Sequence, residues 1–192
     1  MLPRALSVLI LILAGAARWP SGAAISVWID PHNAPPNASA LVVRAMKTWT
    51  DAAEGRFKLE TAATKDAAPI RVSFVGRESN YGETLPRIDR RTGAIVAADV
   101  VISADVVAAA GDALQQRIVA YLTALHELGH ALGLPHTDDF STIMYSFRRP
   151  DDGRRYFSAY RQRLRSADDI GSARATGLSD ADVAALRTLY DR

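Results

Sequence analysis

The chain has no cysteine and no long apolar run, and only four of its 192 residues are histidine. Without cysteine it can form no disulfide, carry no cysteine-linked lipid anchor and use no thiol nucleophile. Its apolar stretch, from Ala5 to Ala17, falls short of the about 20 residues that span a bilayer. The formal net charge is only +2, so nothing in it points to nucleic acid or an anionic membrane as a partner. This length suits a single domain with one core.

The N-terminus has the pattern of a secretory signal peptide, with Arg4, the apolar run and then the small residues Gly22-Ala23-Ala24. We therefore expect residues 1–24 to be removed on export. An uncleaved anchor is the alternative. The pattern predicts a protein that is secreted, either extracellular or periplasmic, with no stable membrane insertion after the signal is cleaved.

The cleavage position has two candidates in the sequence, after Ala16 and after Ala24. The second is favoured, because a strand-like segment opens at Ile25. The mature domain is then expected to span residues 25–192. Removal of the two arginines in the signal makes basic and acidic residues equal in number, so the mature protein is expected to be neutral.

Residues 126–136 read His-Glu-Leu-Gly-His-Ala-Leu-Gly-Leu-Pro-His. His126 and His130 are four residues apart, so on a helix they project from one face and can bind one metal ion. Gly133 can adopt a positive φ, which lets the chain turn back and bring in His136 as a third ligand. Three protein ligands leave one tetrahedral position of zinc open, as in catalytic sites. Glu127 is then placed to take a proton from water activated by the metal.

The spacing of apolar residues predicts the elements around this motif. Apolar residues at helical spacing predict one helix from Ser39 to about Glu54 and a second from Asp112 or Ala113 to about Leu132. The second helix carries the first two histidines. Alternation predicts strands at residues 25–30, 57–61, 70–75 and 95–103, with a short edge strand at 84–89.

The histidine motif resembles that of the metzincin zinc proteases, in which a methionine-containing turn follows the third histidine. Here Ser141-Thr142-Ile143-Met144-Tyr145 follows, and the resemblance implies that Met144 lies beneath the metal as an apolar floor. The chain is most similar to the matrixins, because of Thr137, the Met144-Tyr145 pair and a C-terminal stretch, residues 178–190, that resembles their last helix. The resemblance covers most of the mature chain and is weakest upstream of the motif.

The resemblance implies an α+β fold: a twisted, mostly parallel five-stranded sheet with one antiparallel edge strand, a ligand-bearing helix and a C-terminal helix. In matrixins the edge strand lines the cleft and pairs with the substrate backbone. We therefore expect Thr84, Leu85 and Tyr145 to line the cleft. The resemblance also implies that Asp182 could hold the methionine turn, although a capping box with Ser179 is the simpler role.

Matrixins usually carry a second, structural zinc ion and several calcium ions. The ligands for these are missing here, since His32 is the only other histidine and is expected to be a plain surface residue. We therefore expect one zinc ion, and the sequence argues against calcium.

Residues 146–177 lengthen the connection between the methionine turn and the last helix relative to matrixins. This insertion mixes aromatic residues with the arginines Arg148, Arg149, Arg154, Arg155, Arg161, Arg163 and Arg165. The simpler interpretation is a solvated loop with a short helix. The alternative is a lid or exosite near the cleft that attracts acidic substrates by charge.

Together these features predict a secreted zinc endopeptidase that acts as a monomer on protein or peptide substrates. Two alternatives stay open. One is a catalytically inactive, zinc-folded binding module, against which the intact Glu127 argues. The other is a zinc amide hydrolase acting on cell-wall peptides, because the same ion and base hydrolyse any positioned amide.

Overall fold

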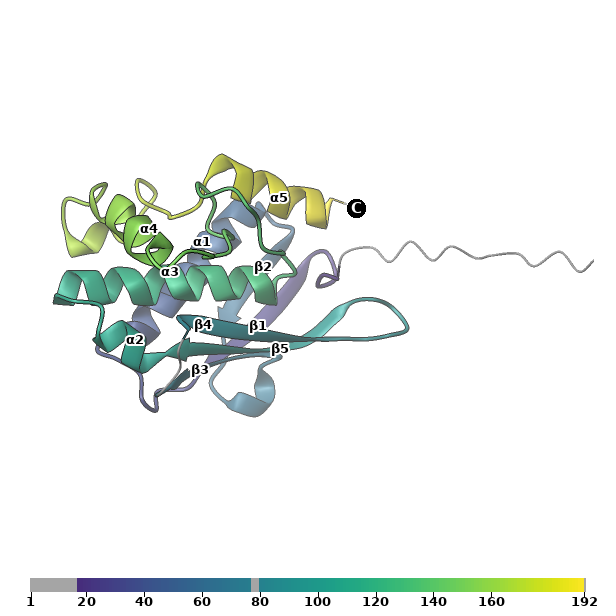
Figure 1. Cartoon of the computed structure of the whole chain (residues 1–192). Coiled ribbons are helices and arrows are strands. Elements are labelled where there is room, and N and C mark those ends of the chain that lie inside the picture. Colours follow the sequence, from purple (N-terminus) through teal and green to yellow (C-terminus); the bar gives the residue numbers. More distant parts are fainter. Residues whose placement is uncertain (1–16, 77–79, 192) are drawn as a thin grey trace, which may run out of the picture.

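The computed structural model describes residues 17–76 and 80–191 (Figure 1). Most of the predicted signal segment, residues 1–16, lies outside the described residues. The elements in chain order are β1 (Ala23–Ile29), α1 (Ala38–Ala53), β2 (Phe57–Thr61), η1 (Lys65–Ala67), β3 (Ile70–Val75), β4 (Gly82–Ile88), β5 (Ile95–Ser103), α2 (Ala104–Ala108), α3 (Ala113–Ala131), α4 (Asp152–Arg161), η2 (Ala167–Asp169) and α5 (Asp180–Tyr190). Among the described residues, no helix combines the length and the apolar character needed to cross a membrane.

The five strands form one sheet in the order β2-β1-β3-β5-β4. All neighbouring strands run parallel except β4 and β5, which are antiparallel. The predicted α+β fold, with a mostly parallel sheet and one antiparallel edge strand, is therefore confirmed. The edge strand β4 begins at Gly82, slightly before the predicted start at Thr84.

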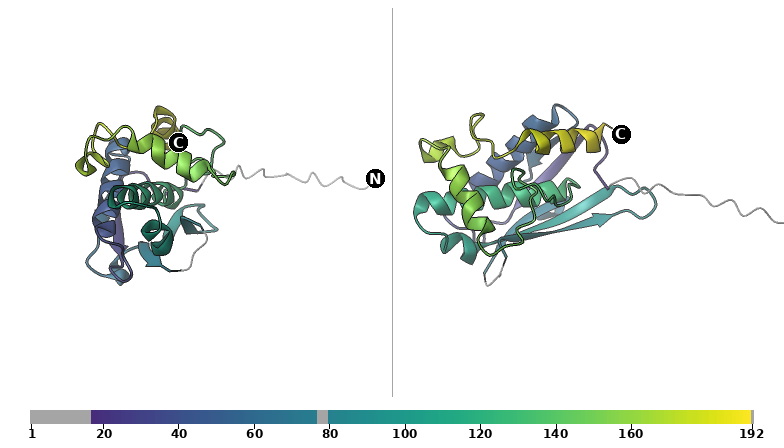
Figure 2. Two further views of the ribbon diagram at one scale, coloured as in Figure 1. Left: turned by 60° about the vertical axis from the view of Figure 1, so that its left-hand side comes forward. Right: turned by 45° about the horizontal axis from the view of Figure 1, so that its top comes forward.

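Helices α1 and α3 pack side by side on one face of the sheet, and α4 and α5 lie beyond them on the side away from the sheet (Figures 1 and 2). The helices cover this face of the sheet because apolar side chains alternate along its strands. In β3, for example, Ile70, Val72 and Phe74 are buried, whereas the residues between them are half-buried. Every residue of α3 from Ile118 to Gly129 is buried. The helix that carries the histidine motif is thus the centre of the core.

The chain ahead of β1 is part of the packed domain. Trp19 is 6% exposed, and its indole Nε1 donates to the carbonyl oxygen of Ala131 at 2.8 Å. The amide of Ile95 donates to the carbonyl oxygen of Arg18 at 2.9 Å. The predicted domain boundary before Ile25 therefore falls inside β1, and it leaves the buried Trp19 outside the predicted domain.

The insertion between the methionine turn and α5 contains the expected short helix, α4, but it packs into the domain and is not a solvated loop. Phe157, Tyr160, Ile170 and Ala175 are all buried. The hydroxyl of Tyr160 donates to the carbonyl oxygen of Ala175 at 2.6 Å and accepts from the amide of Gly171 at 3.0 Å. These hydrogen bonds join α4 to the loop that follows it. The ring of Tyr160 also stacks on Tyr121 of α3, with centroids 6.1 Å apart, so the insertion is part of the core.

Candidate metal centre and cleft

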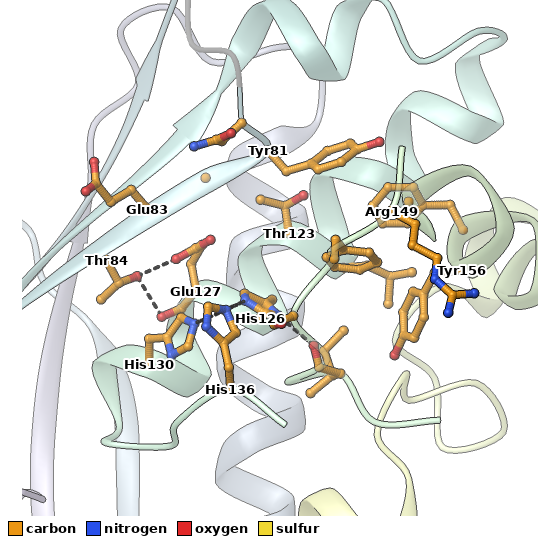
Figure 3. Close-up of a pocket in the computed structure, with 18 of the residues that line it drawn as sticks. Tyr81, Glu83, Thr84, Thr123, His126, Glu127, His130, His136, Arg149 and Tyr156 are labelled. Carbon is orange, nitrogen blue, oxygen red and sulfur yellow. Dashed lines mark hydrogen bonds between the residues drawn. The ribbon is translucent and has the colours of Figure 1, made fainter. Parts of the chain in front are cut away.

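Three histidine side chains meet at one point at the C-terminal end of α3 (Figure 3). His126 and His130 lie one turn apart on the helix. Gly133, with φ of 98°, then turns the chain back, and the following loop supplies His136. The Nε2 atoms of the three rings lie 3.1, 3.1 and 3.2 Å from one another. In the described part of the chain, no other group of three or more histidine or carboxylate side chains could hold a metal ion.

These separations fit a zinc ion. Nitrogen ligands about 2.0–2.1 Å from a tetrahedral zinc lie roughly 3.3–3.4 Å from one another. Nδ1 of His126 is 2.6 Å from the carbonyl oxygen of Ile143, and Nδ1 of His130 is 2.8 Å from that of Leu134. Because a carbonyl only accepts, both Nδ1 atoms donate, so each Nε2 keeps its lone pair for a metal.

The surroundings favour the neutral form of all three rings. Burial, together with the neighbouring His130, lowers the pKa of His126 to about 3. Burial also lowers the pKa of His130 and of His136. Neutral imidazole is the form that binds metal, so the three residues could bind zinc at neutral pH without first losing protons.

Glu127 follows the first histidine on α3 and is 5% exposed. Its carboxylate points toward β4, where the hydroxyl of Thr84 donates to Oε2 at 2.7 Å (Figure 3). Burial raises the pKa of Glu127 to about 7, although the Thr84 hydrogen bond opposes the rise. A carboxyl group whose pKa lies near neutrality is suited both to taking a proton and to returning it.

The methionine turn packs against the helix that carries the first two histidines. Met144 is 2% exposed, and its sulphur lies against Gly129 of α3 so closely that a side chain at Gly129 would not fit. The amide of Thr137 donates to the carbonyl oxygen of Met144 at 2.8 Å. This hydrogen bond joins the turn to the residue that follows His136.

Asp182, at the start of α5, fulfils both of the roles that the sequence suggested for it. Its two carboxylate oxygens accept from the amide of Ile143 at 3.1 and 3.0 Å. It also completes a capping box with Ser179. The carbonyl oxygen of Ile143 accepts from Nδ1 of His126, and the amide of Ile143 donates to Asp182. Ile143 therefore links the buried Asp182 carboxylate to a histidine of the triad.

A pocket of about 510 Å³ opens beside the histidines. The start of the edge strand β4 lines one part of the pocket. The insertion lines another part with Ser146, Phe147, Arg149, Pro150, Gly153, Tyr156 and Phe157. The ring of Tyr81 packs edge-on against Phe157, with centroids 5.0 Å apart. The insertion therefore belongs to the cleft as well as to the core.

The residues expected in the cleft have different positions. Thr84 lines the pocket. Leu85 projects from the opposite face of β4 and is 56% exposed. Tyr145 does not line the pocket, and its hydroxyl donates to Asp152 at 2.9 Å. His32 lies on the surface, where its ring contacts Asp30.

Sequence reasoning placed the insertion near the cleft only as an alternative interpretation, and it did not predict the aromatic wall that the insertion contributes. The only signal for it was the set of aromatic residues among the arginines, and this signal gives no position relative to the histidines.

The matrixin family model matches residues 26–170. The match runs from β1 through the histidine motif and into the insertion. A search of curated proteins found no match to the chain.

Proposed function

Because the chain belongs to the matrixin family of metallopeptidases, we propose that it is a zinc-dependent endopeptidase acting on proteins or peptides. One observation carries the proposal. Three Nε2 atoms lie 3.1–3.2 Å from one another, and the next residue after His126 is a buried glutamate that faces the pocket.

In the proposed reaction, His126, His130 and His136 would hold one zinc ion. Bound zinc lowers the pKa of a water molecule and polarises a carbonyl group. Glu127 takes a proton from the attacking water and passes it to the leaving amine. Water attacks directly, so the enzyme forms no covalent bond to the substrate.

The edge strand offers a place for the substrate backbone. Within the described part of the chain, β4 pairs with β5 on one side and with no strand on the other, and Gly82, Glu83 and Thr84 line the pocket. An extended peptide can add to the free edge of such a strand through main-chain hydrogen bonds. In this arrangement the peptide would lie between β4 and the segment after the methionine turn.

A peptide library tests the proposed function. We expect the zinc-loaded chain to cut internal peptide bonds, and a chelator to abolish cutting. Glu127→Gln is the matched control, since it should retain zinc and lose hydrolysis. A wild-type chain that holds zinc but cuts no peptide would support the inactive, zinc-folded binding module. Cutting confined to cell-wall peptides would support the zinc amide hydrolase.

We also propose that the protein is secreted and that its signal is cleaved after Ala16 rather than after Ala24. Ala14-Gly15-Ala16 has small residues at the positions that signal peptidases read. Cleavage after Ala24 would remove Trp19, which is buried and hydrogen-bonded to Ala131. A protein without this tryptophan would have a cavity at the end of α3.

The N-terminal sequence of exported protein tests this proposal. A first residue of Ala17 would support it, and a first residue of Ile25 would contradict it. Retention of the whole chain in a membrane fraction would favour the uncleaved anchor.

A further inference from the structure

We propose that Thr84 is a positioning residue for the general base, acting with the space that Gly82 provides. The inference rests on the role proposed above for Glu127. The Thr84 hydroxyl lies 2.7 Å from Oε2 of Glu127 and 2.9 Å from its main-chain oxygen (Figure 3). A hydroxyl has one hydrogen to donate, and both acceptors belong to the same glutamate.

The hydrogen bond distinguishes the two carboxylate oxygens. Oε2 accepts from Thr84, and among the described residues no other side chain hydrogen-bonds to this carboxylate. Oε1 is then the oxygen left to receive the proton of the attacking water. Charge-assisted hydrogen bonds of this kind are short and directional, so they fix the plane of a carboxylate as well as its position.

Gly82 lies on the same face of β4 as Thr84, because side chains two residues apart in a strand point the same way. A Cβ at position 82 would lie 2.8 Å from Cγ of Glu127, 2.9 Å from its Oε1 and 2.8 Å from the main-chain oxygen of Val101 on β5. All three distances are below van der Waals contact, so a side chain there would displace the glutamate as well as disturb the pairing with β5. In β4, Gly82 thus leaves space for the Glu127 side chain, and Thr84 supplies the hydrogen-bond donor to its carboxylate.

This arrangement leaves the substrate-binding groups of Thr84 free. Its side chain points toward α3, whereas its main-chain N–H and C=O lie in the plane of the sheet. A peptide that pairs with β4 therefore does not compete for the hydroxyl. One residue can contact the substrate through its backbone and orient the base through its side chain.

The test compares Thr84→Val, which keeps the shape of the side chain and removes the hydroxyl, with Thr84→Ser, which keeps the hydroxyl. Thr92→Val is the matched control, because Thr92 is exposed in the turn of the same hairpin. Each variant is measured for kcat, KM, zinc content and Tm. General bases contribute about 10²–10⁴-fold to a rate, and we expect the loss of orientation in Thr84→Val to lower kcat by about tenfold.

The expected pattern is a lower kcat for Thr84→Val with unchanged KM and full zinc content, and recovery to near wild-type kcat in Thr84→Ser. A kcat within about twofold of wild type in Thr84→Val would overturn the inference. So would a raised KM at unchanged kcat, which would mean a substrate contact, or a parallel loss of zinc and Tm, which would mean a structural role. Wild-type protein that holds zinc and cuts nothing would instead remove the proposed function itself.

Discussion

Replacement of Trp19 should destabilise the protein strongly, because the side chain is 6% exposed and its indole caps the carbonyl of Ala131 at the end of α3. Truncation of a buried tryptophan to alanine costs about 3–5 kcal/mol. In a chain of this size, 1 kcal/mol lowers Tm by about 2–4 °C. Trp19→Ala should therefore lower Tm by roughly 6–20 °C.

Trp19→Phe separates packing from hydrogen bonding. The phenyl ring fills most of the space, but the carbonyl of Ala131 loses its donor. A buried acceptor without a partner costs about 1–3 kcal/mol, so Tm should fall by roughly 2–12 °C, and by less than in Trp19→Ala.

Thermal unfolding followed by circular dichroism gives these values for chains that begin at Ala17. Trp28→Ala is the matched control, because Trp28 is only partly buried. A Tm for Trp19→Ala within about 2 °C of wild type, or no lower than that of Trp28→Ala, would refute the packing of the N-terminal segment. The argument for cleavage after Ala16 would then fail as well.

Two further predictions concern the charges around the site. Metal-free protein should lose stability in acid. The pKa of His126 is lowered to about 3 in the folded protein, whereas a histidine in the unfolded chain has a pKa near 6.5. Below about pH 6.5 the unfolded state therefore binds a proton that the folded state does not, which favours unfolding. The free energy of unfolding should fall by up to about 1.4 kcal/mol per pH unit for this histidine, and equal values from denaturant titrations at pH 7 and pH 5 would contradict a buried neutral ring. Arg149→Glu should lower kcat/KM for peptides with an acidic residue near the cut bond more than for their alanine counterparts, because Arg149 is exposed and lines the pocket. If the ratio of kcat/KM for the acidic peptide to kcat/KM for its alanine counterpart is the same in Arg149→Glu as in the wild type, the insertion does not select substrates by charge.

The strands and α1 could be predicted because they follow from local periodicity: burial alternates along β3, and α1 presents an apolar stripe to the core. The histidine motif was readable for the same reason, since the spacing of His126 and His130 and the turn at Gly133 are local properties. The arrangement of the strands in one sheet was implied by the resemblance to matrixins.

The features that were missed depend on contacts between distant parts of the chain. Trp19 and Ala131 are 112 positions apart, so nothing near Trp19 in the sequence indicates that it is buried. The position of α4 at the cleft was, for a related reason, only the alternative interpretation of the insertion. Phe157 and Tyr160 have helical spacing, but the arginines around them favoured a solvated loop with a short helix. Only the packing of α4 against α3 and Tyr81 places it at the cleft.

The central claim is that three imidazoles hold one zinc ion, and elemental analysis of the purified chain tests it most directly. After incubation with zinc and removal of the excess, we expect one zinc ion per chain in the wild type and close to none in His130→Ala, which loses one of the three ligands. A wild-type chain that retains no zinc under these conditions would contradict the account.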